Sequence, residues 1–566
     1  MACYDRALAL NAEDAIAWLG RGNALFELRR NGEAIAAYDH ALALDRTMAK
    51  AWLGRGNVLL VGKQMEPALA AYDKALAFDF ALENAWAGRG NIFQQQKQYD
   101  QSAPAYGRVL ALNPGHPFTR GVLLHQKMLA CDWSGMEDMI LDIEAGIAKG
   151  RLVAEPFGWQ GISFSPESLQ RCAELYAARL YPSAPLAAQV APAADKIRIG
   201  YLSGEFRDQA TSQLLVGVLE QHDGSRFEIT AFDNGQDDGS ITRGRIAAAV
   251  QAIVPIRDLS DEEAAAVIRS HGIDILVNLN GYFGDHRMRI FAQKPAALQV
   301  NWLGFPGTLG APYIDYIVAD RTVIPDEQRH FFSEKVVWLP HCYQPNDRNK
   351  PIAQTQENRA QHGLPANGFV FCCFNNSYKI LPATFESWMR LLRDVAGSVL
   401  WLIEDNSLAT TNLQGEADRR GIHPARLVFA SRLPLPQHLA RHRLADLFLD
   451  TLPSNAHTTA SDALWAGLPV LTCRGDAFAG KVAASLLTAI GLPELIAETP
   501  DDYEAMALTL AREPARLAAL RRKLDANRLT TSLFDTAQFT RHLEAAFAAM
   551  QARRNSGLAP DHIAVP

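Results

Sequence analysis

The sequence lacks most features that mark secreted or membrane proteins. Seven cysteines are spread over 566 residues, an odd number with no Cys-x-x-Cys pair, which is typical of reduced thiols in a cytoplasmic protein. No apolar run approaches the roughly 18 residues that a membrane span needs. The first residues, MACYDRALALNAED, lack the basic and apolar parts of a secretory signal. We therefore expect a cytoplasmic protein without a membrane span.

An excess of positive charge is also missing. The chain has 55 Lys and Arg residues and 62 Asp and Glu residues, which gives a net charge of −7. No overall positive field therefore attracts nucleic acid or anionic lipid. The motif Asp-x-Asp is absent, which argues against a mechanism that needs a metal-bridged diphosphate. The composition, 48% hydrophobic and 21% charged, is that of a globular protein, and the length favours three or four domains.

The start of the chain repeats with a period of 34 residues. Three units cover 15–48, 49–82 and 83–116, and each contains two amphipathic helical patterns. The residues in register are Trp18, Trp52 and Trp86; Gly22, Gly56 and Gly90; and Tyr38, Tyr72 and Tyr106. This spacing resembles the tetratricopeptide repeat. Because 4–11 match only the second half of a unit, we expect an all-α repeat superhelix over 1–117, with three full units and an N-terminal half unit.

Asparagines recur on the first helix of each repeat, at Asn23, Asn57 and Asn91. Repeat arrays present an extended concave surface that usually binds a peptide or a partner protein. An amide offers both donors and an acceptor, so this ladder could hold an extended peptide backbone along the repeat groove. The alternative, in which these amides bond neighbouring repeats, is equally open at this stage.

The pattern of apolar and polar residues changes after the repeats. Residues 118–196 read as a helical transition and linker, and 181–196 are rich in Pro and Ala. Short apolar runs then alternate with helical patterns, which predicts parallel, doubly wound α/β sheets in two Rossmann-like lobes, 197–360 and 361–566, the second with terminal helices. The expected strands are 197–203, 227–233, 273–280, 298–304, 315–320, 335–340, 369–375, 398–404, 426–431, 447–451 and 469–472.

Two segments that follow expected strands carry candidate chemistry. FNNSYKI (374–380) places Lys379 at a strand's carboxyl edge, where its charge suits a phosphate or diphosphate. In 450–470, HTT opens a helix whose free amides, with the hydroxyls of Thr458 and Thr459, suit an anion. Asp462, on the same helix, could accept hydrogen bonds from a ribose diol. A solvated lysine and an ordinary helix cap are the alternatives.

Two other patterns do not support a site. GDAFAGKV (475–482) has Val482 where a phosphate-binding loop needs Ser or Thr after the lysine. His438 and His442 have the i, i+4 spacing of zinc ligands, but the glutamate of an HExxH motif and a third ligand are missing. Gly-rich turns at 280–286 and 304–311 instead allow close backbone approach to a ligand.

The repeats followed by YLSGEF, ILVNLNGY, WLGFPGT, DYIVAD, FNNSYK, HTT and VAASLL resemble the O-linked N-acetylglucosamine transferase family. The resemblance covers essentially the whole chain in order. It implies the two-lobe GT-B fold and transfer of N-acetylglucosamine from UDP-N-acetylglucosamine to Ser or Thr hydroxyls of proteins. It also implies inversion of the anomeric centre without a metal or another cofactor.

The family resemblance assigns roles to individual residues. Lys379 matches the lysine that neutralises the diphosphate leaving group, with Asn376 beside it. His457, Thr458 and Thr459 match the phosphate-binding HTT, and Asp462 matches the ribose-binding aspartate. The remaining donor-site positions are His438 and Arg441, which flank the uracil, and Leu303, Gly304 and Pro306, which touch the sugar.

The chain departs from the family pattern where a proton must move. Gln209 replaces a histidine at the sugar and acceptor, and Glu205 replaces an aspartate. Glutamine accepts no proton at neutral pH, so Glu205 or the substrate phosphate would have to take it. The family's groove asparagines correspond to Gly20, Gly54 and Gly88.

Two alternatives stay open. One keeps the fold and changes the donor to GDP-fucose or UDP-glucose. The other is a weakly active or inactive transferase that acts as a repeat scaffold, which Gln209 favours.

Overall fold

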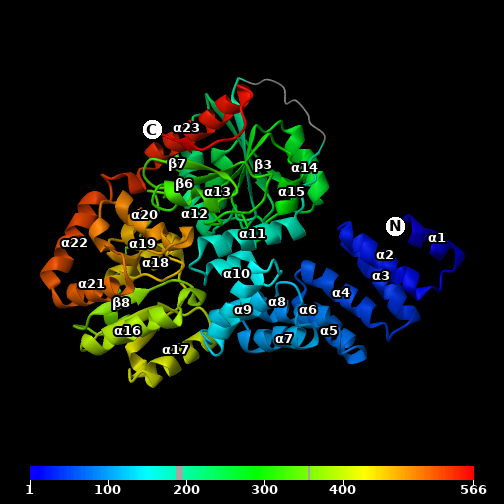
Figure 1. The fold of residues 1–566 in the computed structure, drawn as a ribbon, viewed down its shortest axis with the longest axis horizontal. Helices are drawn as coiled ribbons and strands as arrows, with labels where there is room; N and C mark the ends of the chain where they lie inside the picture. Colours follow the sequence, from blue (N-terminus) through cyan, green and yellow to red (C-terminus); the bar gives the residue numbers. More distant parts are fainter. Residues whose placement is uncertain (187–194, 355–356) are drawn as a thin grey trace. The chain divides into compact units, whose positions relative to one another are not determined.

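The computed structural model describes residues 1–186, 195–354 and 357–566. The chain forms two compact units, Met1–Ala130 with Gly135–Met139 and Cys131–Ser134 with Ile140–Pro566 (Figure 1). Part of the predicted linker, 187–194, lies outside the described residues. The predicted fold class, repeat helices followed by two parallel α/β sheets, is confirmed.

Helices α1 to α8 build the first unit, and α2 to α7 pack as consecutive pairs that correspond to the three predicted repeats (Figure 1). Their bounds are α1 Ala2–Leu10, α2 Ala15–Glu27, α3 Asn31–Leu44, α4 Ala49–Val61, α5 Met65–Phe78, α6 Glu83–Gln95, α7 Tyr99–Leu112 and α8 Thr119–Leu129. Helix α8 packs on α7, so the compact unit extends past residue 117.

Each repeat tyrosine is held between glycines of two successive repeats. A Cβ atom on Gly22 would lie 2.6 Å from the Tyr38 ring, and one on Gly54, in the next repeat, would lie 2.5 Å from the same ring. Tyr72 has the same relation to Gly56 and Gly88. The ring therefore fills the space that a side chain at Gly54 or Gly88 would need, which explains why these positions cannot carry an asparagine.

Most of α9, then α10 and α11, precede the first sheet in the second unit, and every described strand pairing in this sheet is parallel. The strand order is β14-β7-β6-β5-β4-β1-β2-β3. The strands are β1 Ile197–Ser203, β2 Phe227–Asp233, β3 Ala252–Pro255, β4 Ile275–Asn278, β5 Leu298–Asn301, β6 Tyr316–Asp320 and β7 Lys335–Leu339. The helices are α9 Met136–Ala148, α10 Pro156–Gln160, α11 Pro166–Leu180, α12 Ala210–Gln221, α13 Ile241–Ala249, α14 Asp261–Ser270 and α15 Met288–Ala292.

The second sheet is also parallel, in the order β10-β9-β8-β11-β12-β13. Its strands are β8 Val370–Cys373, β9 Val399–Ile403, β10 Leu427–Ala430, β11 Leu447–Leu449, β12 Val470–Cys473 and β13 Ile496–Ala497. Its helices are α16 Pro382–Asp394, α17 Ser407–Arg419, α18 Leu435–Arg441, α19 Thr458–Trp465, α20 Val482–Ala489, α21 Pro500–Arg512 and α22 Pro514–Asn527. All eleven predicted strands are present, and β3, β13 and β14 were not predicted.

The end of the chain returns to the first sheet. Helix α23 (Thr536–Asn555) packs on α12, and β14 (Ile563–Ala564) pairs with β7. Buried Glu544 of α23 accepts a hydrogen bond from the backbone N–H of Asp223 at 2.7 Å. The predicted assignment of all of 361–566 to the second lobe is therefore wrong for these last elements.

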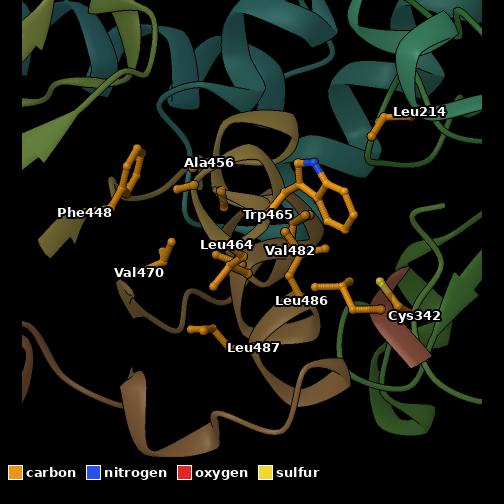
Figure 2. Packing of buried hydrophobic residues seen from close by; sticks show 14 of the residues in the cluster. Leu214, Cys342, Phe448, Ala456, Leu464, Trp465, Val470, Val482, Leu486 and Leu487 are labelled. Atoms are coloured by element: carbon orange, nitrogen blue, oxygen red, sulfur yellow. The ribbon is translucent and has the colours of Figure 1, made fainter. Parts of the chain in front are cut away.

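One hydrophobic cluster joins the two lobes. Figure 2 shows Leu464 and Trp465 of α19 near Val482 and Leu486 of α20, with Cys342 of the segment after β7 close by; all five belong to this cluster. A buried hydrogen bond crosses the same region, since the Ser485 hydroxyl donates to Asp320 Oδ2 at 2.6 Å. The carboxyl end of β6 is thereby fixed to a helix of the second sheet.

Candidate functional site

The predicted phosphate lysine lies at the start of the HTT helix. Lys379 ends a short 3-10 turn after β8, and its ammonium donates to the carbonyl of Asn455 at 2.6 Å. Asn455 comes two residues before His457, the residue that precedes α19. The first amide groups of a helix have no intrahelical acceptor. The fold thus gathers a buried cation and free amides in one place, which suits an anion.

A buried carboxylate shapes the loop that carries this site. Asp450, at the end of β11, accepts hydrogen bonds from the amide of Ala456 and the hydroxyl of Thr472, each at 2.6 Å. Burial raises the pKa of its carboxyl to about 6, so it is ionised at neutral pH. The loop between β11 and α19 is therefore wrapped around a fixed negative charge that also attracts Lys379.

Asn375 connects the two halves of the phosphate site. Its Nδ2 donates to the Thr451 hydroxyl at 2.9 Å, and its Oδ1 accepts from the Thr459 hydroxyl at 2.5 Å. The family resemblance predicted its neighbour Asn376 for this place, but Asn376 is exposed. Asn375 is the second residue after β8, and this position near a strand's carboxyl end is the signal that could have identified it.

Burial controls the charges at the phosphate site. It lowers the pKa of Lys379 to about 8, so the ammonium is charged at neutral pH and has lost part of its hydration. Burial lowers the pKa of His457 to about 3, and the Lys379 charge lowers it further, so this imidazole is neutral. Its Nε2 lies 3.2 Å from the carbonyl oxygen of Ala479. Lys379 is therefore the cationic side chain of this pair.

The predicted uracil residues lie together on α18. Buried Arg441 donates to the carbonyl of Ser431 at 2.6 Å and to Nδ1 of His438. The Arg441 guanidinium also lies over the Phe374 ring, 4.8 Å from its centroid. Burial lowers the pKa of His438 to about 2, so its ring is a neutral, flat surface. An aromatic face beside a fixed guanidinium can hold a planar base.

Asp462, the predicted ribose residue, is buried and already has a charged partner. Its Oδ1 accepts from the Lys350 ammonium at 2.8 Å. Lys350 lies in the segment between β7 and β8 and was not among the predicted site residues. The pair spans 112 residues, so no local motif marks it. Helix α18 packs against α19, which brings the base and ribose residues onto adjoining helices.

The first sheet contributes Glu205 and Gln209. Glu205 follows β1 and is 6% exposed, and a Cβ on Gly284 would lie 3.1 Å from its Oε1. Burial raises the pKa of Glu205, against the charge of Arg207, which lies 3.5 Å away and lowers it. Gln209 precedes α12, and its exposed side chain makes no capping bond. The buried carboxylate, rather than the glutamine, is the side chain that can hold a proton here.

The loop after β5 is held in a strained shape. Leu303 has φ +82°, which a leucine rarely adopts, and a Cβ on Gly304 would lie 2.0 Å from the carbonyl oxygen of Leu279. The carbonyl of buried Pro306 accepts from Gln160 at 2.5 Å. These three predicted sugar-contacting residues thus form one tightly packed loop at the carboxyl end of a central strand.

The groove asparagines are bonded within their own repeats. Tyr38 and Tyr72 donate to the side-chain oxygens of Asn23 and Asn57 at 2.8 and 2.9 Å, and Tyr106 bonds Asn91 in the same way. Each amide oxygen is therefore engaged by a hydroxyl of the same repeat rather than of a neighbour. The NH₂ groups are the ends of these amides that remain as donors for a peptide carbonyl.

None of the helices in the described part of the chain has the length and hydrophobicity of a membrane-spanning segment. Over the same residues, no group of three or more His, Cys, Asp or Glu side chains is arranged to hold a metal ion.

Sequence profiles identify both parts of the chain. The profile described as glycosyl transferase family 41 matches 180–358 and 346–543. Tetratricopeptide repeat profiles match 2–49, 25–81 and 83–116.

Curated proteins match the chain at moderate identity. The chain is 37% identical over 376 residues to a probable UDP-N-acetylglucosamine–peptide N-acetylglucosaminyltransferase, SEC, of Arabidopsis thaliana, which covers 65% of this chain and 38% of that protein. It is 28% identical over 480 residues to the UDP-N-acetylglucosamine–peptide N-acetylglucosaminyltransferase of Caenorhabditis elegans, covering 65% of this chain and 42% of the relative. The chain thus spans about two fifths of the length of these relatives.

A solved structure matches nearly the whole fold. A mutant O-GlcNAc transferase from Thermobaculum terrenum superposes with a TM-score of 0.70 at 26% identity, covering 96% of this chain and 98% of that one. The order of repeats followed by two parallel sheets agrees with this likeness. Since the glycosyltransferase profile matches well over half of the residues, the chain belongs to glycosyl transferase family 41.

Proposed function

We propose that this chain transfers N-acetylglucosamine from UDP-N-acetylglucosamine to Ser or Thr hydroxyls of proteins, with inversion of the anomeric centre. The observation that carries the proposal is the Lys379 ammonium bonded at the N-terminus of α19, beside the HTT hydroxyls. The names of the similar proteins supply the donor and the acceptor class.

Lys379 stabilises the leaving group in this mechanism. As the bond from the anomeric carbon to the diphosphate breaks, negative charge grows on the β-phosphate. A buried ammonium and the amides of α19 bind that charge more strongly than the ground-state diester, which lowers the barrier. Thr458 and Thr459 can donate further hydrogen bonds to the phosphates, and Asp462 accepts from the ribose.

Glu205 is the protein group suited to the acceptor proton. The attacking hydroxyl approaches the anomeric carbon from the face opposite the diphosphate, and it must lose a proton as the new bond forms. A carboxylate whose pKa is raised by burial is a stronger base than one in water. Gln209 can accept a hydrogen bond from the hydroxyl through its amide oxygen and cannot take the proton.

We further propose that the reaction needs no metal ion. Lys379 and the helix amides supply the positive charge that a divalent cation supplies in other transferases. The acceptor peptide is proposed to lie along the repeats, where the NH₂ groups of Asn23, Asn57 and Asn91 can donate to its carbonyls.

The test is transfer of radiolabelled N-acetylglucosamine to protein acceptors, measured with and without EDTA, for wild type and Lys379→Met. We expect EDTA to leave the rate unchanged, and Lys379→Met to lose kcat while still binding UDP. Transfer only after addition of a metal would contradict the metal-free proposal. Wild-type protein that binds no uridine nucleotide would contradict the whole assignment.

A scaffold without activity is the second candidate, and Gln209 is the observation that favours it. Retention of Lys379 at the start of α19, together with HTT and Asp462, favours the transferase, because a scaffold has no use for a buried ammonium at a helix start.

A further inference from the structure

Lys350 is a buried lysine fixed at both ends to the helix of the nucleotide site. Its side chain is 3% exposed, and its ammonium donates to Asp462 Oδ1 at 2.8 Å. Its backbone carbonyl accepts from the indole N–H of Trp465 at 3.1 Å. Both Asp462 and Trp465 belong to α19. The lysine is therefore held against the helix that opens with the HTT residues.

The segment that carries Lys350 comes from the first lobe. After β7, the side chain of Gln344 donates to the Ser461 hydroxyl at 3.3 Å, and the amide of Ala353 donates to the carbonyl of Pro436 at 2.9 Å. The segment thus contacts α19 and the start of α18, the two helices that hold the ribose and base residues. It delivers a cation to a site that belongs otherwise to the second lobe.

The ion pair orients Asp462. A buried carboxylate without a partner is strongly disfavoured. The Lys350 ammonium is that partner, and the bond to one oxygen fixes the orientation of the carboxylate. An ammonium has three N–H groups, and one of them serves Asp462.

We propose that Lys350 is a positioning residue for ribose recognition: it holds the Asp462 carboxylate so that this carboxylate accepts hydrogen bonds from the 2′- and 3′-hydroxyls. The ligand class is a ribonucleoside diphosphate. The inference rests on the proposed function, in which Asp462 binds the ribose. It adds a selectivity against 2′-deoxynucleotides that depends on a residue outside the HTT helix.

The experiment measures the dissociation constants of UDP and 2′-deoxy-UDP by calorimetry for the full chain and its variants. We expect wild type to prefer UDP by about 10-fold or more, as a hydrogen bond to a charged group implies. Lys350→Met is expected to weaken UDP binding by about 10- to 100-fold and to bring the ratio of the two constants close to one. Lys350→Arg, which keeps the charge, is expected to recover part of the preference.

A double-mutant cycle tests whether Lys350 acts through Asp462. In an Asp462→Asn background, Lys350→Met should change UDP binding by less than about 3-fold, because the carboxylate that it positions is gone. If transfer is measured, Lys350→Met should raise KM for the donor much more than it lowers kcat. A lysine that only stabilises the fold would instead lower thermal stability without altering the preference for ribose.

Lys523→Met is the matched control, since it removes an exposed ion pair with Glu494 at 2.6 Å in the same lobe. It should leave both dissociation constants unchanged. If Lys350→Met does not fold, Lys350→Arg and Asp462→Asn still report the preference. Equal binding of UDP and 2′-deoxy-UDP by wild type, or a preserved preference in Lys350→Met, overturns this inference alone. Absence of UDP binding by wild type overturns the proposed function.

Discussion

The two sides of the candidate site differ in how tightly their side chains are held. On the side of the second sheet, Lys379, Asp450 and Thr459 are all engaged in short hydrogen bonds to one another's loops. On the side of the first sheet, Glu205 is buried beside Arg207, and the Gln209 side chain is exposed. The nucleotide side is therefore organised before any ligand binds, whereas the exposed Gln209 side chain on the acceptor side keeps freedom to adjust. A preformed charge site favours the transition state, and an adaptable side suits varied acceptors.

Lys379→Met should give the largest effect, because it removes the cation of the organised side. We expect kcat to fall by about 10²- to 10³-fold, the loss typical of one oxyanion-stabilising group. The measurement is single-turnover transfer, with UDP binding followed separately. Comparable losses in kcat and in UDP affinity would contradict a role specific to the transition state.

Glu205→Gln should have the next largest effect. If Glu205 takes the acceptor proton, the loss in kcat should be about 10²-fold, at the lower end of general-base catalysis. With an acceptor of low hydroxyl pKa, the rate of transfer should fall less, since such a nucleophile depends less on a general base. An unchanged rate would indicate that the substrate phosphate receives the proton.

The pH dependence of kcat/KM tests the charge of Lys379 on the nucleotide side. Burial lowers the pKa of Lys379 to about 8 in the free protein. Above that pH the ammonium loses its proton, so kcat/KM for the donor should fall about tenfold per pH unit. A bound diphosphate favours the charged lysine, and kcat should therefore decline only at higher pH. A kcat/KM that stays flat to pH 10 would exclude Lys379 as the required cation.

Gln209→His should give the smallest change and in the opposite direction. The exposed side chain at the start of α12 makes no capping bond, so the substitution should alter stability by less than about 0.5 kcal/mol. A histidine there can accept a proton, and we expect a several-fold gain in kcat near pH 7.5. Gln213→His, one helical turn further on, is the control that should bring no gain.

The sequence predicted the regular parts of both regions because their signals are local. Strands such as β8 and β11 are continuous apolar runs, and each ends beside a candidate site. Strands β13 and β14 have two residues each and no pattern that a sequence can show. Lys350 is missed for a related reason, since its partner Asp462 lies 112 residues away.

The repeat asparagines show that a repeat period does not reveal side-chain partners. The period places Asn57 on a helix of a groove-forming repeat, and it cannot show that Tyr72 donates to its oxygen. That bond depends on how two helices pack, which no spacing records. The roles assigned to single residues by the family resemblance remain predictions until the measurements above are made.

The shared tyrosines have a mechanical consequence. Since Tyr38 touches glycines of its own repeat and of the next, bending at one junction must move a ring that also belongs to its neighbour. Deformation therefore spreads along the array, and the repeats deform elastically together rather than independently. A force applied by a bound peptide at one repeat would therefore displace repeats several units away.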